Sequence, residues 1–414
     1  MFVWLFKRKG AIQRHQNGPL LQERLKYLQY YKDNGATFKT LRRYANYLLI
    51  VPRVLKLQNN RIVPISKITK AAQKLSNRSG YKNRLSKNAR SFRGIAICWL
   101  EMLGRLKYPD KKNTVASELI TKYADYMRLE RGFTEGSIST YVFIIKDFFK
   151  NIGENRPLQR LNILKIDKVI GEKFRVNGHT RNTIKSYCAA IRMFLRYAEE
   201  RKMCRKGLAE SIKLPHIYMD ESIPHSPTRE DVIKLLKSVE GNHPTDIRDR
   251  AILMLLAIYG LRRGEVAKMR LDDLDWENEI IYINRLKNSK VQKFPLSPSV
   301  GKAILRYLKE VRPQNCPYRE VFIMLFAPHH PLSGKAITQV VGRRLKIINP
   351  TLEHRGPHSL RHACATHLIN KGISLKQISD YLGHQSLEST RIYAKVDLTN
   401  LRKVTADLEI NDLI

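Results

Sequence analysis

The chain has 414 residues, enough for two or three domains that each bury a core, and its hydrophobic content of 43% is ordinary for a globular protein. Its charge is not ordinary, because 76 Lys and Arg against 37 Asp and Glu give a formal net charge of +39. Such an excess repels itself unless a polyanion neutralises it, so it predicts DNA or RNA as the main partner rather than a merely basic surface.

The sequence is not typical of a membrane protein or of a protein stabilised by disulfides. No apolar run approaches the ~20 residues of a spanning helix. The opening MFVWLF is too short for a signal peptide, and its basic residues follow rather than precede it. The five cysteines are scattered, odd in number and without a CxxC pair, so we expect neither a disulfide framework nor a zinc site. A reducing cytoplasm fits this pattern.

The first region, residues 1–112, combines helical periodicity with an excess of 22 positive charges. A leucine repeat at helical spacing before Gly35 predicts one helix, and residues 40–57 predict a second, bent or broken at Pro52. Residues 78–94 carry six Lys and Arg and are expected to lie, as a loop or a helix, on phosphates. We therefore expect this region to extend a DNA contact.

The second region, residues 113–208, is predicted to be a compact domain of four or five helices. Residues 117–132, 137–152 and 180–202 each place apolar side chains on one helical face. Basic residues on the polar faces are candidate DNA contacts, although a surface Lys or Arg is more often simply solvated. The candidates are Lys146, Arg181, Lys185 and Arg192.

A linker at residues 209–226 leads to the third region, residues 227–414. This region begins at a predicted capping box of Thr228 and Asp231. It is expected to be helical except for two neighbouring strands joined by the polar turn LKNSK, residues 286–290. The fold class predicted for the whole chain is mainly α with a small β-sheet (α+β), with a helical domain ahead of the α+β domain.

The first stretch of the third region that could carry chemistry is GLRRGE. An apolar helix is predicted to end at Gly260, and Arg262 then lies on a short, rigid corner where its planar fork suits a phosphate. Glu265, one turn later, could buttress that guanidinium or be solvated. Lys287 lies in the hairpin turn, where it could reach a groove or a leaving oxygen, although lysines in such turns are usually solvated.

The second stretch is PHSLRHACATHL. His358 and Arg361 are three residues apart, so on one exposed helical turn they share a face and can converge on one phosphate. His362 and His367 are expected to fall on other faces and to be structural.

The third stretch is YLGHQSLESTRIYAKV. Gly383 is predicted to end an amphipathic helix, His384 follows it, and Tyr393 lies nine residues later on a further short helix. With nineteen tyrosines in the chain, Tyr393 is a weak nucleophile candidate when taken alone. Jointly, GLRxxE, a hairpin lysine, HxLRH and LGH followed by a tyrosine resemble the tyrosine recombinase family of phage integrase type. The second region is similar to that family's core-binding domain in pattern only.

The resemblance implies a site-specific DNA recombinase that works through a 3′-phosphotyrosyl intermediate. One departure is Gly264, where the family usually has Ser or Thr, at a position that is not catalytic. No metal or cofactor is expected, because two arginines and a lysine can supply the required field and no Mg²⁺ cluster or P-loop appears. The implied catalytic residues are Tyr393 as nucleophile, Arg262 and Arg361 on the non-bridging oxygens, Lys287 as general acid, His358 as general base and His384 as a hydrogen-bond partner of the phosphate.

The resemblance also implies an assembly. A homo-tetramer on two double-stranded DNA sites is expected, and partner recombinases or DNA-bending factors remain open. The tail, residues 396–414, is expected to pack either into a neighbouring protomer or against its own domain. The biological role expected is integration, excision or transposition of a mobile element in a bacterial or phage setting, at the cytoplasmic nucleoid. Two alternatives are a type IB topoisomerase and a catalytically silent DNA-binding regulator.

Overall fold

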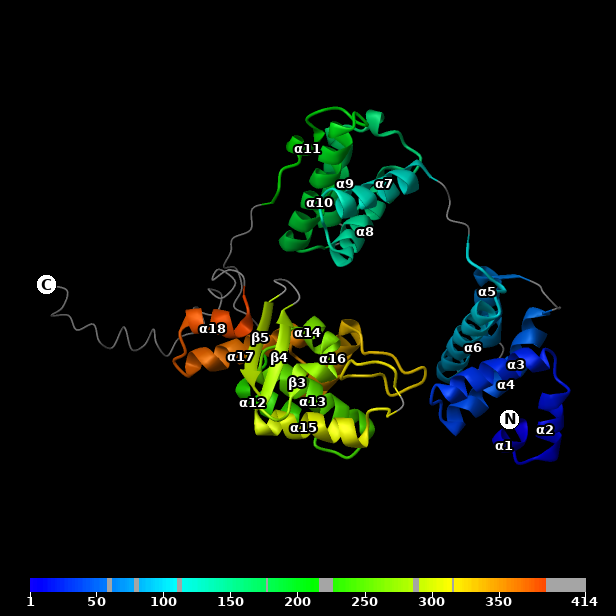
Figure 1. The fold of residues 1–414 in the computed structure, drawn as a ribbon. Helices are drawn as coiled ribbons and strands as arrows, with labels where there is room; N and C mark the ends of the chain where they lie inside the picture. The colour runs from blue at the N-terminus through cyan, green and yellow to red at the C-terminus, as the bar shows by residue number, and fades with distance from the viewer. Residues whose placement is uncertain are drawn as a thin grey trace. The chain divides into compact units, whose positions relative to one another are not determined.

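The chain folds into two compact units, Met1–Lys107 with Ser222–Ile414, and Tyr108–Glu221 (Figure 1). The computed structural model describes residues 1–57, 62–77, 82–109, 114–175, 178–215, 226–285, 290–314 and 316–384. Four hydrophobic clusters stabilise it, and their buried members span residues 2–100, 116–212, 235–360 and 365–382. Each cluster lies within one of the three regions that the sequence analysis distinguishes.

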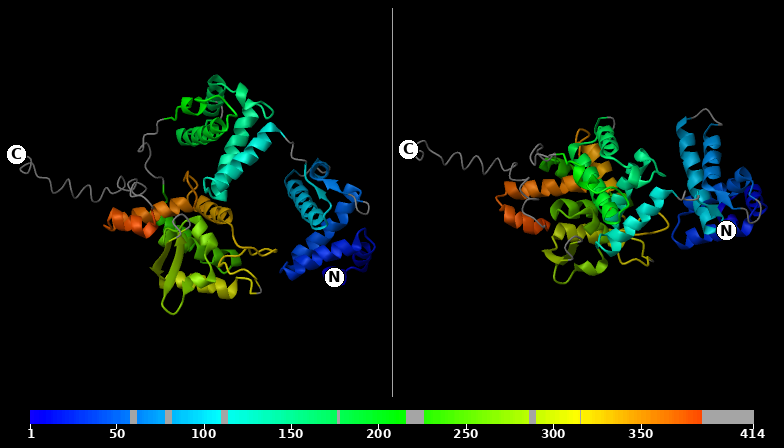
Figure 2. Two further views of the ribbon diagram at one scale, coloured as in Figure 1. Left: turned by 45° about the horizontal axis from the view of Figure 1, so that its top comes forward. Right: turned by 90° about the horizontal axis from the view of Figure 1, so that it is seen from above.

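Residues 1–107 form a helical module with its own core, in which Trp99, Tyr27 and Phe92 are fully buried. Helices α5 and α6 pack against each other and lie side by side in each view (Figure 2). The elements are α1 (Phe2–Leu5), α2 (Lys9–Gln16), α3 (Leu21–Asp33), α4 (Phe38–Leu55), β1 (Val63–Pro64), α5 (Ile65–Asn77), α6 (Lys82–Met102) and β2 (Leu106–Lys107).

Two expectations for this module can be compared with the structure. The helix predicted before Gly35 is α3, and Gly35 has the positive φ of 82° that favours glycine after a helix end. The helix predicted to be bent or broken at Pro52 is not broken there, because α4 continues through that residue to Leu55. Proline removes one intrahelical hydrogen bond, and α4 tolerates this loss within its last turn.

The second unit is a bundle of helices, as predicted. Thr114, Thr134 and Thr180 each cap a helix by accepting a backbone N–H three residues later. The buried cluster extends to Ile212, beyond the expected limit at residue 208. The elements are α7 (Val115–Leu129), α8 (Glu135–Ile152), η1 (Leu158–Arg160), α9 (Ile163–Arg175), α10 (Arg181–Glu200) and α11 (Leu208–Ser211).

The third region is helical around a small antiparallel sheet of strand order β3–β4–β5 (Figure 1). The capping box of Thr228 and Asp231 and the two predicted strands are confirmed. The elements are α12 (Arg229–Lys237), α13 (Pro244–Ile258), α14 (Arg263–Lys268), η2 (Leu271–Asp273), β3 (Leu274–Asp275), β4 (Ile280–Arg285), β5 (Lys290–Pro295), α15 (Pro298–Glu310), α16 (Gly334–Ile348), α17 (Pro357–Asn370) and α18 (Leu375–Leu382).

The junction between α13 and α14 depends on Gly260. Its φ is +58°, and a Cβ there would lie 2.6 Å from the Cδ2 atom of Leu382 in α18. Only glycine combines this left-handed backbone with so close an approach. The next residue, Leu261, is fully buried and anchors the corner. The corner therefore holds Arg262 at a fixed position beside the end of α18.

Several expected features concern the whole chain. In the part that the structure describes, no helix has both the length and the apolar character needed to cross a membrane. The same residues contain no group of three or more His, Cys, Asp or Glu side chains arranged to hold a metal ion. All five cysteines are free, and Cys188, Cys204 and Cys364 are buried.

Candidate active site

Helix α18 ends against three arginines that come from three different elements. The last carbonyls of a helix lack intrahelical partners and form the negative end of its dipole, so cations are favoured there. Gly383 has φ of +67° and closes the helix. Three consecutive carbonyls each accept a hydrogen bond from a different guanidinium: Tyr381 from Arg285 at 2.8 Å, Leu382 from Arg361 at 2.6 Å, and Gly383 from Arg262 at 2.8 Å.

Arg262 is held from two sides. Its Nη1 donates to Glu265 Oε1 at 2.9 Å, and its backbone N–H donates to Glu265 Oε2 at 2.7 Å. The side chain of Glu265 is 1% exposed, whereas that of Arg262 is 27% exposed. A carboxylate at the third position of α14 therefore orients the arginine at the helix start, and the arginine stays partly accessible to a ligand.

Arg361 bridges the other two segments of the site. Its Nη1 donates to the carbonyl of Gly260 at 2.7 Å, in addition to its bond to Leu382. It lies in α17, beside α18 (Figure 1), and it is buried rather than on the exposed turn that we expected. The difference arises because the end of α18 packs over this face of α17. His358, three residues earlier, remains exposed.

The expectation that His362 falls on a different helix face from His358 is wrong. The rings of His358 and His362 are edge to face, with centroids 4.2 Å apart. Residues four apart share a helical face as residues three apart do, so the spacing in HSLRH already predicted this contact. Although part of the His358 side chain is exposed, desolvation of its imidazole, followed by the charge of Arg361, lowers the pKa of His358. Desolvation, followed by the proximity of His358, lowers the pKa of His362 to about 4.

His384 follows α18 directly and is half-buried, with its backbone N–H bonded to the carbonyl of Ser379 at 2.9 Å. Desolvation is the main cause that lowers its pKa to about 4, and the charges of Arg361 and Arg262 add to it. At neutral pH the imidazole is therefore uncharged. It can take part in hydrogen bonds beside the arginines without adding to their mutual repulsion.

Arg285 is a candidate site residue that the sequence analysis missed. It lies at the end of β4 and is 3% exposed, with Nη1 bonded to Glu265 Oε2 at 2.9 Å and Nε to Gln292 Oε1 at 2.9 Å. The alternation of β4 places it on the same buried face as Ile281 and Ile283. A charged residue on the inward face of a predicted strand is the signal that could have identified it, because such a charge requires partners.

Two expected catalytic residues, Lys287 and Tyr393, lie outside the described residues. So do the short helix expected over residues 386–393 and the tail at residues 396–414. The described part of the site thus consists of Arg262, Glu265, His358, Arg361 and His384, to which the structure adds Arg285 and His362.

The four candidate DNA contacts of the second unit differ in their surroundings. Lys146, Arg181 and Lys185 are exposed. Arg192 donates from Nε and Nη2 to the backbone carbonyls of Ala209 and Ile212, so it holds the chain after α10 against the bundle. These bonds give Arg192 a packing role that the sequence did not indicate.

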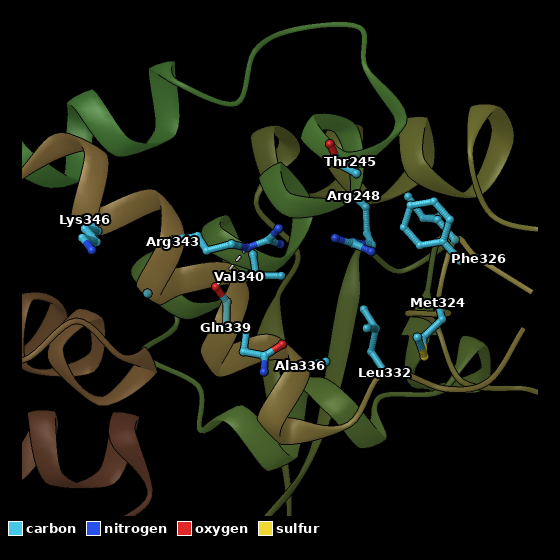
Figure 3. Close-up of a pocket in the computed structure, with 12 residues that line it drawn as sticks. Thr245, Arg248, Met324, Phe326, Leu332, Ala336, Gln339, Val340, Arg343 and Lys346 are labelled. Atoms are coloured by element: carbon cyan, nitrogen blue, oxygen red, sulfur yellow. Dashed lines mark hydrogen bonds between the residues drawn. The ribbon is translucent and has the colours of Figure 1, made fainter. Parts of the chain in front are cut away.

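A separate pocket of about 640 Å³ lies between α13, α16 and the segment before α16 (Figure 3). Its walls are mainly apolar, with Leu332 and Val340 among them, and Arg343 and Lys346 stand at its edge. None of the expected catalytic residues lines it. Its composition suits an apolar group rather than the phosphate chemistry of the arginine cluster.

We predict a specific pH dependence for the two shifted histidines. Unfolded histidine titrates near pH 6.5, whereas His362 and His384 titrate at about 4 in the folded protein. Between these values the unfolded chain binds more protons, so the stability present at neutral pH is lost as the pH falls from 6.5 toward 4. NMR titration of labelled histidines should give midpoints at about pH 4 for His362 and His384 instead of the ordinary 6.5.

The matched variants are His384→Gln and His330→Gln, the second changing an exposed histidine of the same unit. His384→Gln should make the decline of unfolding free energy between pH 7 and pH 4.5 shallower, and His330→Gln should not. NMR titration midpoints near pH 6.5 for both His362 and His384 would contradict the burial of these two side chains.

The comparisons with known proteins identify the family. The model of the phage integrase family matches residues 227–399, and that of the phage integrase N-terminal SAM-like domain matches residues 120–202. A putative integrase/recombinase, y4rA from Sinorhizobium fredii, is 32% identical over 296 residues, which cover 71% of this chain and 71% of that protein.

Solved structures share the fold. A XerH site-specific recombinase bound to its difH substrate aligns with a TM-score of 0.55 at 20% identity, over 87% of this chain and 96% of that one. A lambda integrase tetramer bound to a Holliday junction aligns with a TM-score of 0.53 at 18% identity, over 72% and 86%. The sequence matches favour a recombinase over the type IB topoisomerase alternative. The chain belongs to the phage integrase, or tyrosine recombinase, family of site-specific DNA recombinases, which cut and rejoin DNA strands through a phosphotyrosine intermediate.

Proposed function

We propose that Arg262, Arg361 and His384 bind the scissile phosphate, and that Tyr393, Lys287 and His358 carry out its cleavage. The observation that supports this most directly is the convergence of three arginines on the end of α18. His384, which follows that helix end, lies nine residues before Tyr393 in the chain. A tyrosine delivered from this point would meet a phosphate already surrounded by donors.

In the proposed reaction, the Tyr393 hydroxyl attacks the phosphorus and a 3′-phosphotyrosyl bond forms. The bond to the 5′-oxygen breaks, and Lys287 gives that oxygen a proton. His358 accepts the phenol proton. A general base must be unprotonated to act, and the lowered pKa of His358 keeps it neutral at physiological pH.

Charge in the transition state collects on the non-bridging oxygens. Arg262 and Arg361 are fixed beforehand by carbonyl and carboxylate partners, so they need not reorganise when that charge develops. His384, neutral beside them, would hydrogen-bond a non-bridging oxygen. Because the phosphotyrosyl bond conserves the energy of the phosphodiester, rejoining would be the reverse attack by a DNA 5′-hydroxyl, without ATP.

We propose that the remaining basic surfaces hold the duplex. In the second unit, Lys146, Arg181 and Lys185 are exposed on or at the start of α8 and α10. Residues 1–112 carry an excess of 22 positive charges, and exposed basic side chains lie on both α5 and α6: Lys70, Lys74, Arg90 and Arg93. These would extend the contact along the phosphate backbone, mainly without sequence preference.

We further propose that four protomers act on two DNA sites, as the lambda integrase tetramer on its junction suggests. The biological role proposed is movement of a mobile element in a bacterial or phage setting, within the cytoplasm. The relative named as an integrase/recombinase and the basic first region support it.

The catalytic proposal predicts a covalent adduct. Wild type on a nicked suicide duplex bearing the native site should give a DNA–protein band on a denaturing gel, and Tyr393→Phe should give none, because the nucleophile is absent. Tyr282→Phe, which changes a tyrosine of β4 in the same domain, is the matched control and should keep the adduct. Arg361→Ala should slow adduct formation by about 10²–10³-fold, as loss of one transition-state donor does.

Each departure from these results has a definite meaning. An adduct with Tyr393→Phe would show that another tyrosine attacks. DNA binding by wild type without any adduct on its native site would favour the silent DNA-binding alternative.

The proposal for the first region predicts a change in salt dependence. Replacing Lys70, Lys74, Arg90 and Arg93 together by Gln should weaken DNA binding and reduce the slope of log affinity against log salt, by up to about 0.9 for each phosphate that is no longer neutralised. The control exchanges Lys for Arg, and Arg for Lys, at the same four positions and should keep the slope. An unchanged slope in the Gln variant would exclude this surface from the DNA interface.

A further inference from the structure

Among the described residues, Arg285 is the one buried arginine that contacts α14, β5 and the end of α18. It bonds Glu265, which orients Arg262; Gln292, across the hairpin in β5; and the carbonyl of Tyr381, at the end of α18. Its guanidinium also lies over the Phe294 ring, 5.6 Å from the centroid. Its Nε, Nη1 and Nη2 each donate one of these hydrogen bonds, so protein groups engage all three of its nitrogens.

The charges of this group do not balance in pairs. Glu265 accepts from Arg262 through Oε1 and from Arg285 through Oε2, each at 2.9 Å. One carboxylate therefore serves two guanidinium groups, and the three side chains together carry one net positive charge. Without Arg285, Glu265 would neutralise Arg262 alone, and that pair would offer a phosphate no net charge.

We propose that Arg285 is a positioning residue. It pairs with one oxygen of the Glu265 carboxylate, so Glu265 does not fully neutralise Arg262, and Arg262 keeps positive charge for the scissile phosphate. This inference rests on the proposed role of Arg262. Arg285 acts through Glu265 and the end of α18 and does not touch the substrate. Its contribution is electrostatic first and structural second.

Gly383 gives independent support for a built arrangement. A Cβ at this position would lie 2.7 Å from Nε and 3.0 Å from Cζ of Arg285. The glycine of the LGH stretch is thus required both by its φ of +67° and by the guanidinium packed against it. The backbone that presents His384 and leads to Tyr393 is shaped around Arg285.

The test separates charge from packing by changing the charge of the substrate. A methylphosphonate at the scissile position lacks the negative charge of the phosphodiester, so it needs less positive charge in the site. Arg285→Met should slow adduct formation on the phosphodiester about ten- to a hundred-fold more than on the methylphosphonate. The double variant Glu265→Gln with Arg285→Met should recover the wild-type ratio of the two rates, because the neutralising carboxylate is gone.

The matched control is Arg248→Met. Arg248 is a buried arginine of α13 that pairs with Asp249, outside the site. Its replacement should affect both substrates by equal factors. Arg285→Lys, which keeps the charge, should keep the wild-type ratio even if its rates fall.

The outcomes distinguish this inference from the proposed function beneath it. If Arg262→Ala slows adduct formation on the methylphosphonate as much as on the phosphodiester, the proposed role of Arg262 fails. If Arg262→Ala is relieved while Arg285→Met slows both substrates equally, Arg285 is only a packing residue and the inference is overturned. Should Arg285→Met fail to fold, the double variant and Arg285→Lys are measured instead. If either gives a ratio of phosphodiester to methylphosphonate rates that differs from the wild-type ratio, the proposal is contradicted.

Discussion

The carbonyls at the end of α18, which lack partners within the helix, are the constraint on which the rest of the site depends. A helix end buried without partners is costly, and here three consecutive carbonyls are satisfied by arginines from the α13–α14 corner, from β4 and from α17. The same bonds fix the three guanidinium groups relative to one another. One set of hydrogen bonds therefore closes a helix and assembles the anion site.

The second feature of the site is its charge balance. Three arginines beside a helix end would repel one another strongly in a packed interior, and Glu265 offsets one of the three charges. The neighbouring imidazoles of His362 and His384 are neutral at physiological pH because burial lowers their pKa values to about 4. The site keeps a net positive charge for a phosphodiester while limiting its own repulsion.

Sequence reasoning identified the parts of the site whose positions follow from local spacing. Arg262 after a helix-ending glycine, the pair of His358 and Arg361, and His384 after Gly383 all follow from turns and helical periodicity. Arg285 was missed because its role comes from contacts with α14, β5 and α18, which no local pattern encodes. Strand β3 was missed because two residues carry no periodicity. His362 was missed through an error of reasoning, since its i,i+4 spacing from His358 was available.

The central claim is that the arginine cluster at the end of α18 receives the scissile phosphate. The most direct test is an experimental structure of Tyr393→Phe bound to a duplex carrying the native site, in which the phosphodiester stays intact. The account predicts the scissile phosphate within hydrogen-bond distance of the Arg262 and Arg361 guanidinium groups and of His384, with Arg285 behind Glu265 and not touching the DNA. A scissile phosphate bound elsewhere on the domain, with these arginines still bonded only to protein groups, would contradict it.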